Sequence, residues 1–163
     1  MLNKPIPFPH KQYGMYYVEE DLRDAAYRGD VDRIKKLGAQ YPNLNFNATN
    51  EYGETALYIA CKRNQDSVVS HLLDKPGIDL NVPTILGNLS LLIAAWNDNT
   101  PLAKKLVEKG ADIHARTNPD RTYHGNVSAL DIAKERGNDS LVDYLQQKIA
   151  PEAGKNATPQ LRP

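Results

Sequence analysis

Histidine and acidic side chains are the groups in this chain whose types could bind a metal or support catalysis. His114 and His124 flank a long polar stretch, and Asp112 and Asp120 lie close to them in sequence. Imidazole and carboxylate groups are ligands of Zn²⁺ and related ions, so a small metal-binding or enzymatic protein using residues 114–126 is one functional alternative. The spacing of these residues matches no established metal motif, and we therefore predict no metal site.

Other catalytic patterns are missing from the sequence. It has neither a glycine-rich phosphate loop nor a Gly-x-Ser-x-Gly nucleophile elbow. His71 lies between Ser70 and Leu72 in a segment expected to be helical, where it is predicted to be a surface residue. The single cysteine, Cys61, excludes an internal disulfide and occupies a small-residue position typical of a buried, unreactive thiol. We predict no catalytic residue, no cofactor and no enzymatic activity.

The elements that hold these groups are clearest between residues 53 and 73. Thr55 is a good helix N-cap, and Asn64 can adopt the left-handed backbone conformation that ends a helix. Apolar residues recur at the spacing of one buried helical face, namely Leu57, Ala60 and Cys61 in a first helix and Val68, Val69, Leu72 and Leu73 in a second. Two such short helices cannot close a core alone, so the unit should be repeated.

The unit is indeed repeated along the chain. Leu91 follows Leu57 by 34 positions, Leu130 follows Leu91 by 39, and Leu22 precedes Leu57 by 35. The segments that leave the units recur in the same way and begin at Asn45, Asp79 and Asp112. Four units in one register indicate a repeat protein, in which neighbouring units bury each other's apolar faces.

Units of this length and pattern resemble ankyrin repeats, over roughly residues 19–149. The closest local matches are Glu-Lys-Gly-Ala-Asp-Ile at 108–113 and Ser-Ala-Leu-Asp-Ile-Ala-Lys-Glu-Arg-Gly-Asn at 128–138. The family's Thr-Pro-Leu-His opening reads Thr-Ala-Leu-Tyr at 55–58 but Leu-Ser-Leu-Leu at 89–92, so Ser90 is expected to cap its helix. The resemblance implies an all-α repeat solenoid, an ankyrin-repeat stack of helix-turn-helix units joined by β-hairpin loops.

The expected domain organisation has three parts. Residues 1–17 contain Pro5, Pro7 and Pro9 and are predicted to be an extended arm laid over the first unit. Residues 18–149 form the repeat domain, with approximate unit bounds of 18–50, 51–84, 85–122 and 123–149. Residues 150–163 are predicted to be a disordered tail.

Composition narrows the classes of partner. The 163 residues include 20 basic and 20 acidic side chains, and this balance argues against a nucleic-acid binder. The sequence contains no apolar run of about 18 residues and no apolar segment typical of a secretory signal. We expect a monomeric, cytoplasmic protein without a membrane partner, with delivery into a host cell as an open alternative.

The resemblance also implies where a partner would bind. Ankyrin units bind target proteins with hairpin tips and with exposed residues of the inner helices. Carried onto this sequence, those positions are Tyr27, Arg28, Tyr52, Lys62, Arg63, Ile85, Leu86, Trp96, Asn97, Tyr123 and Arg136. Aromatic and arginine side chains are enriched at interaction hot spots, and apolar side chains at a turn tip have no folding role. An alternative is that Trp96 packs against Lys62 or Arg63 as a cation–π contact.

The predicted function is a protein–protein interaction module, an adaptor or regulator that binds another protein through its concave face and hairpin tips. A narrower alternative is a bacterial-type effector or toxin-neutralising ankyrin protein. Both need only a binding surface, so the sequence leaves them open.

Overall fold

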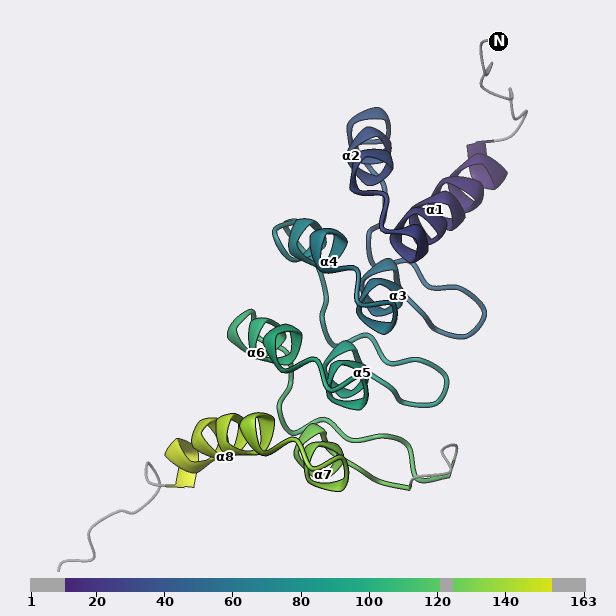
Figure 1. Ribbon diagram of the computed structural model, residues 1–163. Helices are drawn as coiled ribbons and strands as arrows, with labels where there is room; N and C mark the ends of the chain where they lie inside the picture. Colours follow the sequence, from purple (N-terminus) through teal and green to yellow (C-terminus); the bar gives the residue numbers. More distant parts are fainter. Residues whose placement is uncertain (1–10, 121–124, 154–163) are drawn as a thin grey trace, which may run out of the picture. The chain divides into compact units, whose positions relative to one another are not determined.

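The computed structural model describes residues 11–120 and 125–153, whereas residues 1–10, 121–124 and 154–163 lie outside the described part of the chain. The described residues form eight helices, arranged as consecutive pairs along the chain (Figure 1). Their bounds are α1 (Lys11–Arg28), α2 (Val31–Gln40), α3 (Ala56–Lys62), α4 (Asp66–Leu73), α5 (Ser90–Trp96), α6 (Thr100–Glu108), α7 (Ala129–Glu135) and α8 (Asp139–Ala153). The chain divides into two compact units, residues 1–82 and residues 83–163.

The first unit is built around the contacts of α1 and α3. Helix α1 packs against α2 and α3, and α3 packs against α4. The largest fully buried side chains of this core, each at most 1% exposed, are those of Leu22, Ile34, Leu37, Leu57, Val68 and Leu72. Full burial of such a side chain contributes roughly 1.5–3 kcal/mol to the stability of the fold. The helix faces that carry these apolar side chains in the sequence are therefore the faces that pack together.

The second unit repeats this arrangement. Helix α5 packs against α6 and α7, and α8 packs against α7 and α6. Its largest fully buried side chains are Leu91, Leu92, Leu106, Ile132, Leu141 and Leu145.

The turn inside each helix pair has the same backbone geometry in all four repeats. Gly29, Asn64, Asp98 and Gly137 have φ angles of 79°, 55°, 54° and 69°. The residue that follows each of these four closes the turn with a backbone hydrogen bond back to the preceding helix. Examples are Gln65 N to Ala60 O at 2.9 Å and Asn99 N to Ala94 O at 3.0 Å. Glycine, asparagine and aspartate tolerate this left-handed region best, and the prediction for Asn64 is confirmed.

The starts of the inner helices differ from one another. The Thr55 hydroxyl accepts from Tyr58 N and caps α3, and Ser128 forms a capping box with Asp131 at the start of α7. Helix α5 instead has Leu89 at its N-cap, and Ser90 is its first helical residue and is buried. The prediction that Ser90 caps this helix is therefore wrong, because the repeat register places the apolar Leu89 at the cap position.

Two predicted boundaries need correction. Helix α1 begins at Lys11, so residues 11–17 are helical rather than part of an extended arm. The prolines of this region end at Pro9, and nothing after it prevents a helix. Helix α8 continues to Ala153, so residues 150–153 do not belong to a disordered tail. The remaining residues of the predicted arm and tail lie outside the described part of the chain.

The loops between helix pairs are shaped by turns and side-chain hydrogen bonds. Within residues 11–120 and 125–153 no strand forms, and an isolated antiparallel bridge joins Arg116 and Ser128. In the first unit, Asn47 ties two successive loops together, since its side chain donates to Gly77 O at 2.8 Å and accepts from Asp79 N at 2.9 Å. No helix within the described residues is long and apolar enough to cross a membrane.

Candidate functional site

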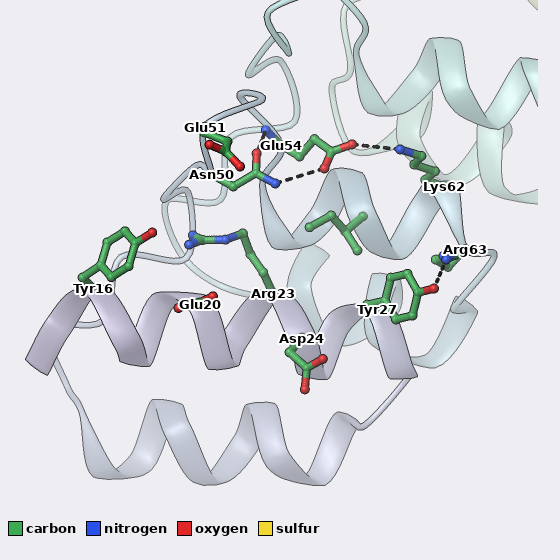
Figure 2. A pocket seen from close by; sticks show the side chains of 11 residues that line it. Tyr16, Glu20, Arg23, Asp24, Tyr27, Asn50, Glu51, Glu54, Lys62 and Arg63 are labelled. Carbon is green, nitrogen blue, oxygen red and sulfur yellow. Dashed lines mark hydrogen bonds and ion pairs between the residues drawn. The ribbon is translucent and has the colours of Figure 1, made fainter.

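A groove of about 550 Å³ lies in the first unit between α1, α3 and the loop that joins α2 to α3 (Figure 2). Side chains on one face of α1, the C-terminal end of α3 and the tip of the loop line it. These residues are Tyr16, Glu20, Arg23, Asp24, Tyr27, Asn50, Glu51, Glu54, Ile59, Lys62 and Arg63. The volume falls in the range of sites that bind small molecules or a few side chains of a peptide.

The loop tip is held in place by Asn50. Its side-chain oxygen accepts from Tyr52 N at 3.0 Å and from Glu54 N at 2.9 Å, and its amide nitrogen donates to Glu54 Oε2 at 3.0 Å. Gly53 follows with a φ of 75°, a conformation that favours glycine. A short polar side chain and a glycine thus fix the wall of the groove.

An ion pair joins this loop to α3. Lys62 Nζ lies 2.9 Å from Glu54 Oε1. Burial disfavours the charged form of Glu54, but hydrogen bonds from Lys62 and Asn50 together outweigh it and hold the pKa of Glu54 below its usual value. Beneath this pair, burial is the main cause that raises the pKa of Tyr58 to about 12, and Lys62 Nζ lies 5.9 Å from the Tyr58 ring centroid.

The other end of the groove is formed by Tyr27 and Arg63. The Arg63 guanidinium carbon lies 3.9 Å from the centroid of the Tyr27 ring, and the guanidinium also donates a hydrogen bond to the Tyr27 hydroxyl. Such cation–π contacts are worth about 0.5–1 kcal/mol at exposed sites. The ring of Tyr27 is nevertheless about half exposed, at 49%.

Arg23 is the charged residue of the groove that is most completely buried, with an exposure of 6%. Within residues 11–120 and 125–153, its side chain makes one hydrogen bond, to Ala48 O at 3.4 Å, and no ion pair. Figure 2 shows the side chain rising from α1 toward the loop that carries Asn50 and Glu51.

The sequence prediction found part of this groove. Tyr27, Lys62 and Arg63 line it. Two further predicted residues lie in the same unit: Tyr52 is 56% exposed at the loop tip, and Arg28 pairs with Asp24 at 2.9 Å.

The other predicted contact residues belong to the second unit. Ile85 and Leu86 are exposed at a loop tip, at 48% and 42%, and Trp96 and Asn97 are partly exposed at the end of α5. Arg136 pairs with Asp98 at 2.6 Å. Tyr123 lies outside the described residues. A partner-binding role for these residues stays a prediction.

Tyr16, Glu20 and Arg23 were not predicted as site residues. Residue 16 was assigned to the arm and residue 20 to the repeat domain, so their common face on α1 was not recognised. A signal for Arg23 was present in the repeat register, because the equivalent positions carry Tyr58, Leu92 and Asp131.

The histidines and the long loop show no metal centre within the described residues, where no group of three or more His, Cys, Asp or Glu side chains could hold an ion. Asp112 accepts from His114 N at 2.9 Å, as Asp79 does from Asn81 N at 2.8 Å, so this is a repeated turn contact. His124 lies outside the described residues. His71 is partly buried rather than a surface residue, and its Nε2 has no partner in the described part of the chain.

Comparison with known proteins assigns the class. A family model described as ankyrin repeats (3 copies) matches residues 22–117. The chain belongs to the ankyrin-repeat family, and the predicted fold class, an all-α ankyrin-repeat solenoid, is confirmed. Ankyrin repeats are in general protein–protein interaction modules without enzymatic activity.

Several characterised proteins are similar over part of their length. The chain is 35% identical over 119 residues to "Probable E3 ubiquitin-protein ligase XBOS31" of Oryza sativa subsp. japonica, which covers 69% of this chain and 26% of that protein. It is 38% identical over 78 residues to human "Ankyrin repeat domain-containing protein 40", covering 47% of this chain and 20% of that protein. The human "SMC5-SMC6 complex localization factor protein 1" is 36% identical over 108 residues, or 66% of this chain and 10% of that protein. The chain thus spans about a quarter or less of the length of these relatives.

Proposed function

We propose that this chain is an adaptor or regulator that binds a segment of another protein in the groove between α1, α3 and the loop tip at residues 50–54. The observation that carries the proposal is the exposure of aromatic side chains along a groove that also contains a buried arginine. Tyr16 and Tyr27 are 59% and 49% exposed, and both line the groove.

The exposed parts of these tyrosine side chains bury no apolar area within the fold and are free to contact a partner. Tyrosine offers a large apolar area together with a hydroxyl, and it loses few rotamers when a partner binds. Arginine and tyrosine are the side chains that most often carry the binding energy of an interface. Because Tyr27 is already held by Arg63, part of the groove is preorganised, and this lowers the entropic cost of binding.

The groove is also mixed in charge, with three basic and four acidic residues in its lining. Balanced charge supports a protein partner rather than a nucleic acid, for which a basic patch would be needed. We expect the protein to act as a monomer in the cytoplasm, and the effector and toxin-neutralising alternatives would use the same groove. The exposed pair Ile85 and Leu86 is a second candidate contact surface, within the second unit.

The proposal is tested by affinity capture from an extract of the native cells with the full chain as bait. Tyr16→Ser should reduce the captured partner at least about tenfold, because loss of a hot-spot aromatic typically costs 2 kcal/mol or more. Tyr144→Ser is the matched control, since it removes a tyrosine ring from α8 in the second unit, which does not line the groove. Equal capture by wild type and Tyr16→Ser would show that the partner binds elsewhere.

A further inference from the structure

The repeat register shows that the fold does not require a charge at residue 23. Leu22, Leu57 and Leu91 are equivalent, so the residue after each is equivalent too. The second and third repeats place Tyr58 and Leu92 there, and both are buried, at 4% and 0%. The first repeat places the guanidinium of Arg23 at a position that its neighbours fill with a packed ring or an aliphatic side chain.

The hydrogen bonding of this guanidinium is incomplete. An arginine side chain carries five N–H donors, and within the described residues Arg23 uses one of them, over 3.4 Å to a backbone carbonyl. A buried charge is costly unless it is paired and its donors are satisfied. The guanidinium of Arg23 therefore has unused N–H donors, and the described residues that line the groove supply no group that accepts two of them at once.

The charges next to Arg23 limit what that acceptor can be. Glu20 and Glu51 line the same groove, are exposed, and form no ion pair within residues 11–120 and 125–153. Asp24 and Glu54 are already paired with Arg28 and Lys62. A group with two negative charges would be repelled by the two unpaired glutamates, whereas a single carboxylate followed by a cation would satisfy all three side chains.

We propose that the groove recognises an acidic side chain next to a basic one in a segment of the partner protein. The carboxylate accepts two parallel hydrogen bonds from Arg23, and the neighbouring lysine or arginine meets Glu20 and Glu51. Tyr16 covers the segment from the side of α1. This inference rests on the proposed function and adds the chemistry of the partner to it. Bidentate arginine–carboxylate pairing gives both strength and a fixed orientation, which suits Arg23 as the anchor.

The test uses a phage-displayed library of random twelve-residue peptides selected on the immobilised full chain. We expect the selected peptides to share Asp or Glu beside Lys or Arg. One enriched peptide, synthesised with a fluorescent label, is then titrated by anisotropy. Arg23→Gln should weaken its binding by roughly 30-fold or more, and Asp→Asn in the peptide should do the same, because each removes half of a buried charge pair. The two changes together should cost little more than either alone.

Two further variants separate charge from geometry. Arg23→Lys keeps the charge but cannot form the bidentate pair, so it should still weaken binding by roughly tenfold. Arg33→Gln is the matched control, because it removes one positive charge from α2, where Arg33 pairs with Asp21 outside the groove lining. Arg33→Gln should leave binding unchanged, and circular dichroism confirms that each variant is folded.

The outcomes distinguish this inference from the proposed function. If the peptide loses affinity with Tyr16→Ser but not with Arg23→Gln, the groove binds peptides and the carboxylate anchor is wrong. Tighter binding of a peptide with phosphoserine in place of its acidic residue would also overturn the inference, since it would make the site a phosphate site. A library without binders, or a peptide insensitive to both substitutions, would contradict the groove as a binding site altogether.

Discussion

Replacement of Arg23 by methionine should leave the protein as stable as wild type or make it more stable. Methionine keeps the length of the aliphatic stem, and at 6% exposure the side chain needs no charged head for solvation. The change removes one hydrogen bond from the charged guanidinium to Ala48 O. Because this bond is long, 3.4 Å, its contribution falls at or below the low end of the roughly 1.5–3 kcal/mol typical of charged donors. Ala48 is partly exposed, so water can replace the lost donor.

The free energy gained by removing the buried charge is larger than the loss of this hydrogen bond. An incompletely paired buried charge costs on the order of several kcal/mol of desolvation, and replacing buried ionic groups with apolar ones is often neutral or stabilising by about 1–4 kcal/mol. We therefore expect the free energy of unfolding of Arg23→Met to change by about 0 to +2 kcal/mol. Peptide binding should be lost at the same time, because methionine cannot donate to the peptide carboxylate. A residue kept for binding at a cost in stability behaves in this way.

The assay is urea unfolding followed by far-ultraviolet circular dichroism, with wild type and Leu22→Ala measured in parallel. Leu22 is 1% exposed, and its truncation should cost about 2–5 kcal/mol, so the two neighbouring substitutions should move the midpoint in opposite directions or by very different amounts. A loss of more than about 1.5 kcal/mol in Arg23→Met would refute the reasoning, since it would exceed the contribution expected of this single long hydrogen bond. Arg23 would then be a structural residue.

Three other substitutions test the fold and the groove. Thr55→Ala should lower the free energy of unfolding by about 0.5–2 kcal/mol in urea, because the hydroxyl caps α3 through Tyr58 N, and no loss would mean that the cap contributes nothing. Leu106→Ala should cost about 2–5 kcal/mol in the same assay, and a cost below 1 kcal/mol would contradict its place in the core. Since the pKa of Glu54 is lower folded than its ordinary 4.5, its ionised form stabilises the fold above pH 4.5, and this contribution is lost as the pH falls below that value. Wild type should therefore lose more stability than Glu54→Gln on acidification from pH 6 to pH 3, and parallel curves would show that the pair with Lys62 is not stabilising.

The repeat signals in the sequence predicted the helices because they depend on local chemistry and on period. Leu57 and Leu91 are equivalent in the repeat and both fully buried, and Asn64 has the left-handed backbone that its residue type favours. The predictions from sequence were wrong where the preference of a single residue type was followed instead of the repeat register or the exact position of a helix breaker. Ser90 is a good cap by type, yet the register assigns the cap position to Leu89. The first helix begins at Lys11, beyond the prolines that predicted an extended arm.

The groove could be predicted only in part, for a different reason. Tyr27, Lys62 and Arg63 stand at positions that the family resemblance predicted to be exposed on the inner helices, and all three line the groove. Whether a charge is buried and how many acceptors it meets depend on side chains from separate elements, and a single sequence does not contain that information. The repeat register shows that Arg23 differs from its equivalents, but its burial and its single hydrogen bond became apparent only when α1, α3 and the loop at Ala48 were seen together.

Equivalent positions in a repeat protein act as internal controls for one another. The position after the first buried leucine carries Tyr58 and Leu92 as packed residues, and Asp131, whose carboxylate accepts from Ser128 N at 2.9 Å and completes the capping box of α7. Each of these three side chains has a role that the fold explains by packing or capping. Arg23 is buried as well, but its guanidinium makes a single long hydrogen bond in the described residues and caps no helix, and it lines a groove beside two unpaired glutamates. Because the first repeat differs from the others at this position without a structural reason, we propose that Arg23 on α1 serves recognition rather than the fold.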